Sequence, residues 1–273
     1  MEQQQSYKPK YPVLTLEKAL DVINYFKENT NPEGLSLNEI CQALDMKKSS
    51  VHRILDTLYA YDYVKKTFSG NRYKLSWALY DIGNSVPKQY SLSANEYLPA
   101  LNTLCQKYSE TFSIGVLDKT EYIVINIVEP NIQLKSTGNI GERRPLYATG
   151  AGKLFLSEFP ENKIYDFYRE NKIESFTKTT LSTPGRMLNE LYDIKQCGYA
   201  IDNEEHCEGL SCISMPIYDF KGRIVAAISG SGPTQRIMGK IENGLKDDLR
   251  EITCKLSVHL GYKGCHENKD NDK

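Results

Sequence analysis

The chain has 273 residues, which is too long for one ordinary hydrophobic core and predicts two domains. Hydrophobic residues make up 40% and charged residues 25%, and no apolar run approaches the roughly 20 residues that span a bilayer, so a membrane protein is excluded. The seven cysteines are scattered and never form a Cys-x-x-Cys pair, so neither a disulfide framework nor a zinc knuckle is predicted. The start of the chain lacks the apolar core of a secretory signal, and we expect a cytoplasmic protein.

Charge is distributed unevenly along this chain, whose formal net charge is only -1. Between Met46 and Lys74 there are seven cations and two anions, a local balance of +5, so the other 244 residues sum to -6. A basic segment on an otherwise acidic body is typical of a part that contacts phosphate.

The first helix is predicted in residues 15–29, where apolar side chains recur at the spacing of one helix face: Leu16, Ala19, Leu20 and Ile23. A second helix begins after Ser36, which forms with Glu39 the S-x-x-E capping box. Its apolar stripe consists of Leu37, Ile40, Cys41 and Leu44.

A third helix follows the short connection 45–48, and Ser49 is its expected N-cap. Its apolar face consists of Val51, Ile54, Leu55 and Leu58. Two β-prone runs, YVKKTF and RYKLSW, then flank Ser69-Gly70-Asn71, a combination typical of a hairpin turn. Three short helices and a basic hairpin within 13–76 predict a winged helix-turn-helix, mainly α with a β-hairpin wing.

This domain predicts DNA binding, because a helix fits the major groove, where every base pair presents a different pattern of donors and acceptors. The first turn of the third helix carries the side chains expected at base edges, Ser49, Ser50, His52 and Arg53. Lys47 and Lys48 precede it and are expected on phosphate. The wing cations expected on the flanking backbone are Lys65, Lys66 and Arg72. The alternatives are a solvated helix face, a membrane-surface adaptor and a winged helix that binds only protein.

A second domain is predicted over 90–262, joined to the first by a helical connector over 77–89, with flexible tails at 1–12 and 263–273. A helix is expected over 93–110, with Leu98, Leu101 and Leu104 facing inward, followed by a hairpin turning at 118–120. A strand from Gln133 then leads through a glycine-rich loop into a helix near Ala151. A helix ending at Gly198, three further strands and one long helix over 237–260 complete an α/β domain with a mostly antiparallel sheet.

Both parts resemble the IclR family of bacterial transcription regulators. The likeness covers about residues 13–262 and includes LSLNEICQALDMKKSSVHRILDTL, RRPLYATGAGKLFLSE, GYAIDNEEHCEGLSCISMPIYD and RIVAAISGSGP. The resemblance implies a GAF-like effector-binding domain, a homodimer or homotetramer, a palindromic double-stranded DNA operator and a small-molecule effector, with repression more common than activation.

The resemblance places effector contacts at Gly150, Ala151, Asp202, Leu210, Cys212, Ser229 and Ser231. ATGAGKLF is neither a P-loop nor a dinucleotide fingerprint, because Tyr147, Leu154 and Phe155 stand where those motifs require other residues. The free N–H groups of a helix opening at Gly150-Ala151 suit a carboxylate, and hydroxyls, a thiol and one carboxylate fit an organic or sugar acid. The serines at 229–233 also suit a plain strand end, and Cys212 a small core residue.

Two residues depart from the apolar side chains that family members often carry beside the pocket, Ser136 and Arg144, and they predict a more polar cavity or a more anionic ligand unless Arg144 points to solvent. The rival class is an enzyme that uses Cys212, His206 and Asp202 as nucleophile, base and orienting group, or a metal site that adds Cys207. The spacing fits no zinc pattern and no G-x-S-x-G elbow is present, so we expect no catalytic residue, no metal and no cofactor.

Overall fold

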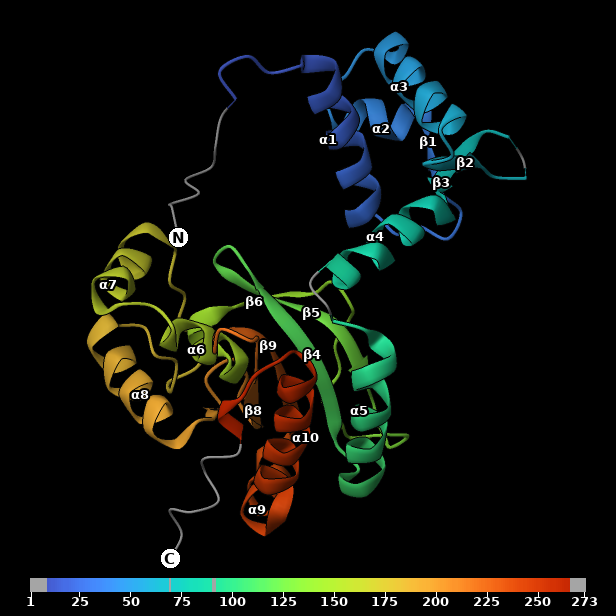
Figure 1. The fold of residues 1–273 in the computed structure, drawn as a ribbon. Coiled ribbons are helices and arrows are strands. Elements are labelled where there is room, and N and C mark those ends of the chain that lie inside the picture. The colour runs from blue at the N-terminus through green and yellow to red at the C-terminus, as the bar shows by residue number, and fades with distance from the viewer. Residues whose placement is uncertain (1–8, 69, 90–91, 266–273) are drawn as a thin grey trace, which may run out of the picture. The chain divides into compact units, whose positions relative to one another are not determined.

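The computed structural model describes residues 9–68, 70–89 and 92–265, and the chain divides into two compact units, 1–90 and 91–273 (Figure 1). The first unit contains α1 (Leu14–Glu28), β1 (Leu35–Ser36), α2 (Leu37–Ala43), α3 (Lys48–Ala60), β2 (Val64–Lys66), β3 (Arg72–Leu75) and α4 (Trp77–Gln89). Within the described ranges no helix is both long enough and apolar enough to cross a bilayer.

Helix α2 begins with the predicted capping box. The Ser36 N–H donates to Glu39 Oε2 at 2.6 Å, and the Glu39 N–H donates to Ser36 Oγ at 3.3 Å. The turn into α3 places Asp45 at φ 49°, a left-handed conformation that Asp tolerates better than most residues. This turn sets α3 across α2 as a helix-turn-helix.

Helix α3 buries the predicted stripe of Val51, Ile54, Leu55 and Leu58. Its start differs from the prediction, because the N-cap is Lys47 and makes no side-chain cap hydrogen bond. Ser49 therefore lies inside the first turn and does not cap the helix. In α1 the core residues are Val22 and Phe26, whereas Leu16 and Leu20 are 57% and 49% exposed. The apolar side chains of α1 therefore lie on two faces of the helix. The face with Val22 and Phe26 packs into the core, and the face with Leu16 and Leu20 is exposed.

The wing is a three-stranded antiparallel sheet in the order β1-β3-β2. The predicted hairpin is β2 and β3, and the two-residue strand β1, absent from the prediction, pairs Leu35 with Tyr73. Of the predicted turn, Ser69 lies outside the described residues, and Gly70 adopts φ 74°, which glycine allows.

The second unit contains α5 (Ala94–Tyr108), β4 (Thr111–Asp118), β5 (Glu121–Val128), β6 (Arg143–Pro145), α6 (Gly150–Ser157), α7 (Glu161–Glu170), α8 (Pro184–Cys197), β7 (Ala200–Asn203), β8 (Leu210–Tyr218), β9 (Ile224–Pro233), α9 (Thr234–Lys240) and α10 (Lys246–His259). Its sheet has the order β6-β5-β4-β9-β8-β7, and every pair is antiparallel.

This sheet carries a separate core on each face (Figure 1). Helices α5 and α10 pack on side chains such as Phe112, Ile213 and Ile228. Helices α6, α7 and α8 cover the other face over Val124, Ala200 and Ala227. Strand alternation therefore decides which core each residue joins.

Three predicted elements of the second unit differ from the structure. No strand forms at Gln133, and the short strand β6 follows the loop instead. Helix α7 was not predicted. The long final helix is broken between α9 and α10, where Gly244 has φ 107°, a value that no helix contains.

Candidate functional site

The outward face of α3 carries the polar side chains predicted for DNA. Lys47, Lys48, Ser49, His52 and Arg53 are exposed, and Ser50 is half-buried. Because the apolar stripe of α3 is fully engaged in the core, the fold fixes which side chains project outward.

The wing divides its predicted cations into two kinds. Lys65 and Lys66 are exposed, and Lys66 Nζ lies 5.1 Å from the ring centre of Tyr59. Arg72 is different, because its guanidinium donates to Glu39 Oε2 at 2.7 Å and to the Gly34 carbonyl at 2.9 Å. Arg72 therefore ties the wing to α2, and its expected contact with the DNA backbone stays a prediction.

Two rows of small side chains cross the sheet beneath α6. One row runs through directly paired positions on β7, β8, β9 and β4, namely Asp202, Cys212, Ser231 and Thr111. The adjacent row contains Ala200, Ser214, Ser229 and Ser113. Paired positions present side chains on the same face, so small polar groups gather there and leave space under the helix.

Glycines let α6 approach this floor. A Cβ on Gly150 would lie 2.8 Å from Ser214 Oγ of the sheet, and one on Gly152 would lie 2.3 Å from the carbonyl of Leu146, in the segment just before α6. Thr149 caps the helix by accepting from the Gly152 N–H at 3.2 Å. The N–H groups of Gly150 and Ala151 precede the first intrahelical hydrogen bond. The glycines thus serve close packing, and the helix start faces the polar rows.

A cavity of about 30 Å³ lies between α6 and the sheet, room for roughly two or three water molecules at about 10–15 Å³ each. It is lined by Ser113, Tyr122, Ser136, Arg144, Thr149, Ala151, Asp202, His206, Leu210, Ser211, Cys212, Ser229 and Ser231. Six of the seven predicted effector residues are among them, and Gly150 packs directly beside Cys212. Arg144 lines the cavity and does not point to solvent.

Sequence reasoning missed several lining residues, chiefly Ser113 and Tyr122. The signal for Ser113 was available, because it alternates with Phe112 and Ile114 on a strand whose apolar side chains face the other core. Tyr122 gave no such signal, because its position depends on space above Gly115.

Ionisation in the cavity argues against a cysteine nucleophile. Burial, reinforced by the charge of Asp202, raises the pKa of the Cys212 thiol to about 12, so the thiolate is scarce at neutral pH. Burial also raises the pKa of Asp202 to about 7, and burial together with the charge of Arg144 lowers the pKa of His206. At neutral pH the Cys212 thiol and the His206 imidazole are therefore mostly uncharged, and Asp202 is partly protonated.

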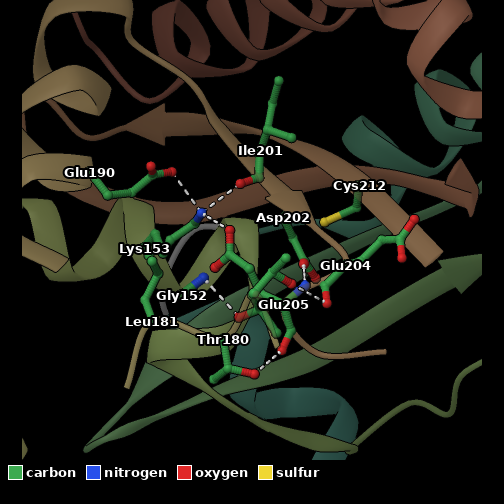
Figure 2. Close-up of polar contacts among 12 residues, drawn as sticks. Gly152, Lys153, Thr180, Leu181, Glu190, Ile201, Asp202, Glu204, Glu205 and Cys212 are labelled. Carbon is green, nitrogen blue, oxygen red and sulfur yellow. Dashed lines mark hydrogen bonds and ion pairs between the residues drawn. The ribbon is translucent and has the colours of Figure 1, made fainter. Parts of the chain in front are cut away.

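Asp202 is held in place by a buried ionic network (Figure 2). Asp202 Oδ1 accepts from the Glu205 N–H at 2.7 Å. Lys153, fully buried in α6, donates to Glu205 Oε1 at 2.6 Å, to Glu190 Oε1 at 2.7 Å and to the Ile201 carbonyl at 2.6 Å. One lysine thus joins α6, α8, β7 and the turn that positions Asp202. Within the described residues no group of three or more His, Cys, Asp or Glu is suited to a metal ion.

Comparison with known proteins agrees with both units. Residues 15–67 match the IclR helix-turn-helix domain, and residues 93–258 match the C-terminal domain of bacterial IclR transcriptional regulators. The chain is 31% identical to the HTH-type transcriptional regulator BhcR of Paracoccus denitrificans over 91% of this chain and 88% of that protein. It is 28% identical to the HTH-type transcriptional repressor AllR of Escherichia coli over 91% of this chain and 90% of the repressor.

Solved structures give the same result. The crystal structure of the Thermotoga maritima IclR superposes with a TM-score of 0.77 at 26% identity, covering 92% of this chain and all of that one. These similarities confirm the predicted winged helix-turn-helix with an antiparallel α/β domain, and the relatives are named regulators and repressors, not enzymes. The chain belongs to the IclR family of bacterial transcriptional regulators.

Proposed function

We propose that this regulator is a repressor that binds a palindromic operator and is controlled by a small carboxylate in the second unit. The observation that carries the proposal is the polar cavity beneath α6 in a chain whose first unit is a winged helix-turn-helix. The name of the relative AllR, a repressor, supports repression over activation.

The DNA contacts proposed for α3 follow from its exposed face. Ser49, Ser50, His52 and Arg53 reach base edges, while Lys47 and Lys48 contact phosphates at the start of the helix. Lys65 and Lys66 contact the flanking backbone from the wing. A DNA target in a bacterial cell supports a cytoplasmic location for the protein.

A homodimer, or a tetramer of two dimers, supplies the two-fold symmetry that a palindrome requires. The apolar residues exposed on α1 and α4 support this proposal, since Leu16 in α1 is 57% exposed and Trp77 in α4 is 72% exposed. We propose α4, at 77–89, as the connector through which effector binding reaches the DNA-binding units.

The effector proposed is a small organic or sugar acid. Its carboxylate binds at the N–H groups of Gly150 and Ala151, and its hydroxyl or carbonyl group contacts Asp202, Cys212 and the serines of β9. Leu210 supplies the apolar wall.

Reciprocal coupling tests this function. A duplex selected from a random library by the purified chain serves as operator, and fluorescence anisotropy follows its binding with and without small carboxylates. Affinity should fall about 100-fold or more between 50 and 200 mM salt, because phosphate contacts release counterions. The acid that weakens DNA binding must itself bind more weakly, by the same factor, to the protein–DNA complex. An adaptor without DNA function would give no selected duplex, and an enzyme would consume the acid.

A further inference from the structure

The cavity contains a hydroxyl that the protein leaves without a partner. Tyr122 is 2% exposed, lines the cavity, and its Oη makes no hydrogen bond within the described part of the chain. A Cβ on Gly115 would lie 2.4 Å from Tyr122 Cε2, so only glycine on β4 leaves room for this ring. The β-bulge between Ile114 and Gly115 adjoins it. A buried hydroxyl with no protein partner, in a cavity, indicates a ligand group that accepts its hydrogen bond.

Arg144 lines the same cavity from the strand that pairs with β5. Tyr122 and Arg144 are paired residues of β5 and β6, so their side chains share one face of the sheet. The Arg144 side chain is 20% exposed, and its Nε and Nη2 donate to the two oxygens of Glu142 at 2.7 and 3.2 Å. A Cβ on Gly138 would lie 2.6 Å from Nη2, so this loop glycine makes room for the guanidinium. Glu142 thereby orients Arg144 through two of its three nitrogens.

The third nitrogen, Nη1, has no hydrogen-bond partner among residues 9–68, 70–89 and 92–265. Arginine only donates hydrogen bonds. Burial raises the pKa of Tyr122 to about 12, so the tyrosine hydroxyl keeps its proton. Two neighbouring donors, one of them charged, suit a carboxylate. Burial alone would lower the pKa of Arg144. The hydrogen bonds to Glu142 and the negative charge of Glu142 outweigh this effect, and the pKa of Arg144 is raised.

This pair lies at the opposite end of the cavity from the carboxylate position proposed above. Tyr122 and Arg144 belong to β5 and β6, whereas Asp202 and Cys212 belong to β7 and β8, with β4 and β9 between them. Because the tyrosine ring extends over β4, the two polar ends are separated by two to three strand spacings, about 10–14 Å between the groups that bind the ligand. This separation suits a diacid of two to four carbons.

We propose that the effector is a compact dicarboxylate whose second carboxylate binds Arg144 and Tyr122. This inference rests on the proposed effector function. The raised pKa of Asp202 is consistent with it, because a protonated Asp202 donates to the first carboxylate and does not repel it.

Matched acids test the proposal. Titration calorimetry on the full chain compares tartronate with lactate and malonate with propionate, pairs in which a carboxylate replaces a methyl group. We expect each diacid to bind at least tenfold more tightly than its partner. Arg144→Gln should abolish that preference while changing monoacid binding less than threefold. The matched control is Arg143→Gln, because Arg143 pairs with Asp118 and Glu121 and does not line the cavity.

Tyr122→Phe separates a ligand contact from a structural role. Its hydroxyl makes no hydrogen bond to the described part of the chain, so the urea midpoint should change little, whereas diacid affinity should drop about three- to tenfold. A loss of stability with unchanged diacid affinity would overturn the role of Tyr122.

The remaining outcomes separate this inference from the proposed function. Equal binding of diacids and monoacids overturns the second carboxylate site and leaves the carboxylate effector standing. A diacid preference that survives Arg144→Gln places the second carboxylate elsewhere and overturns the assignment. No binding by any acid of the panel overturns the carboxylate effector and this inference together.

Discussion

Two arginines of the first unit, Arg53 and Arg72, have different roles. Arg53 is exposed on α3 and forms no ion pair within the described residues, whereas Arg72 is bound to Glu39 and Gly34. Both lie in the basic segment 46–74, and a count of charges along the sequence does not distinguish them. The difference is the capping box, which places the Glu39 carboxylate within reach of Arg72.

Arg53→Ala should weaken operator binding by about 1–3 kcal/mol, because a base-edge contact is lost. The protein's free energy of unfolding should change little, since the side chain contacts solvent. Anisotropy on the selected duplex measures the first quantity and urea unfolding the second. Unchanged affinity would place α3 in a different docking geometry from the one proposed.

Asp202 predicts a pH dependence of stability. Its carboxyl pKa is about 7 in the folded protein and about 3.8 when unfolded, so between these values the folded protein keeps a proton that the unfolded chain releases. The free energy of unfolding should therefore fall as pH rises from about 4 to about 7, by an amount on the order of 2–4 kcal/mol.

Asp202→Asn should remove this part of the dependence, because an amide does not titrate. Relative to the wild type, the variant gains stability at pH 8 and not at pH 5, as measured by urea unfolding. Parallel curves for the two proteins across this range would show that Asp202 ionises normally.

At the scale of elements, helix α6 is held to its neighbours by the ion pairs and hydrogen bonds of a buried lysine as well as by apolar contacts. Lys153 joins three other segments from within a buried site. Lys153→Met should cost about 3–5 kcal/mol of unfolding free energy, because it leaves Glu205 buried without its counter-charge. Adding Glu205→Gln to that variant should recover part of the loss.

An exposed ion pair provides the comparison. Lys107 pairs with Asp248 while its own side chain is 56% exposed, and Lys107→Met should lower stability far less than Lys153→Met does, because solvent screens this pair. Similar losses for Lys153→Met and Lys107→Met, in the same chemical denaturation assay, would contradict the structural weight given to Lys153.

The break between α9 and α10 depends on Gly244. At φ 107° an alanine is strained, so Gly244→Ala should lower stability by more than about 1 kcal/mol. Gly239, inside α9, has open space at its Cβ position, and Gly239→Ala should raise stability by about 0.5–1 kcal/mol. Thermal unfolding of the two variants gives the comparison, and equal shifts would show that the break is not glycine-dependent.

Sequence patterns predicted those elements whose signals are local. The capping box, the apolar stripe of α3 and the Gly198 terminus of α8, at φ 76°, all depend on residues within a few positions of one another. The predicted strand from Gln133 and the predicted unbroken helix over 237–260 were wrong. Apolar spacing alone does not reveal which side chains the neighbouring segments cover.

The candidate site also contains some features that the sequence predicted and others that only the fold reveals. Ser229, Ser231 and Cys212 came from resemblance to a family, and the structure explains their meeting by strand register. Arg144 and Tyr122 are 22 positions apart in the chain and meet only through the pairing of β5 with β6. A single sequence without its sheet order does not give that contact. The domain limits and the residues that bind DNA or effector stay predictions.

For the whole molecule, the sheet of the second unit separates two cores of different character. The face toward α5 and α10 is filled by large apolar side chains, and the face toward α6 carries the two rows of small polar ones. A molecule that enters the cavity touches only the second face.

Ligand binding should therefore slow amide hydrogen exchange on one face of the sheet and not on the other. Binding slows exchange in α6 and β7, while α5 and α10 exchange at the rate of the free protein, because their contacts do not change. The response of the protein to the bound molecule must then begin in the α6 layer or at the β5–β6 border, where the ligand makes its contacts.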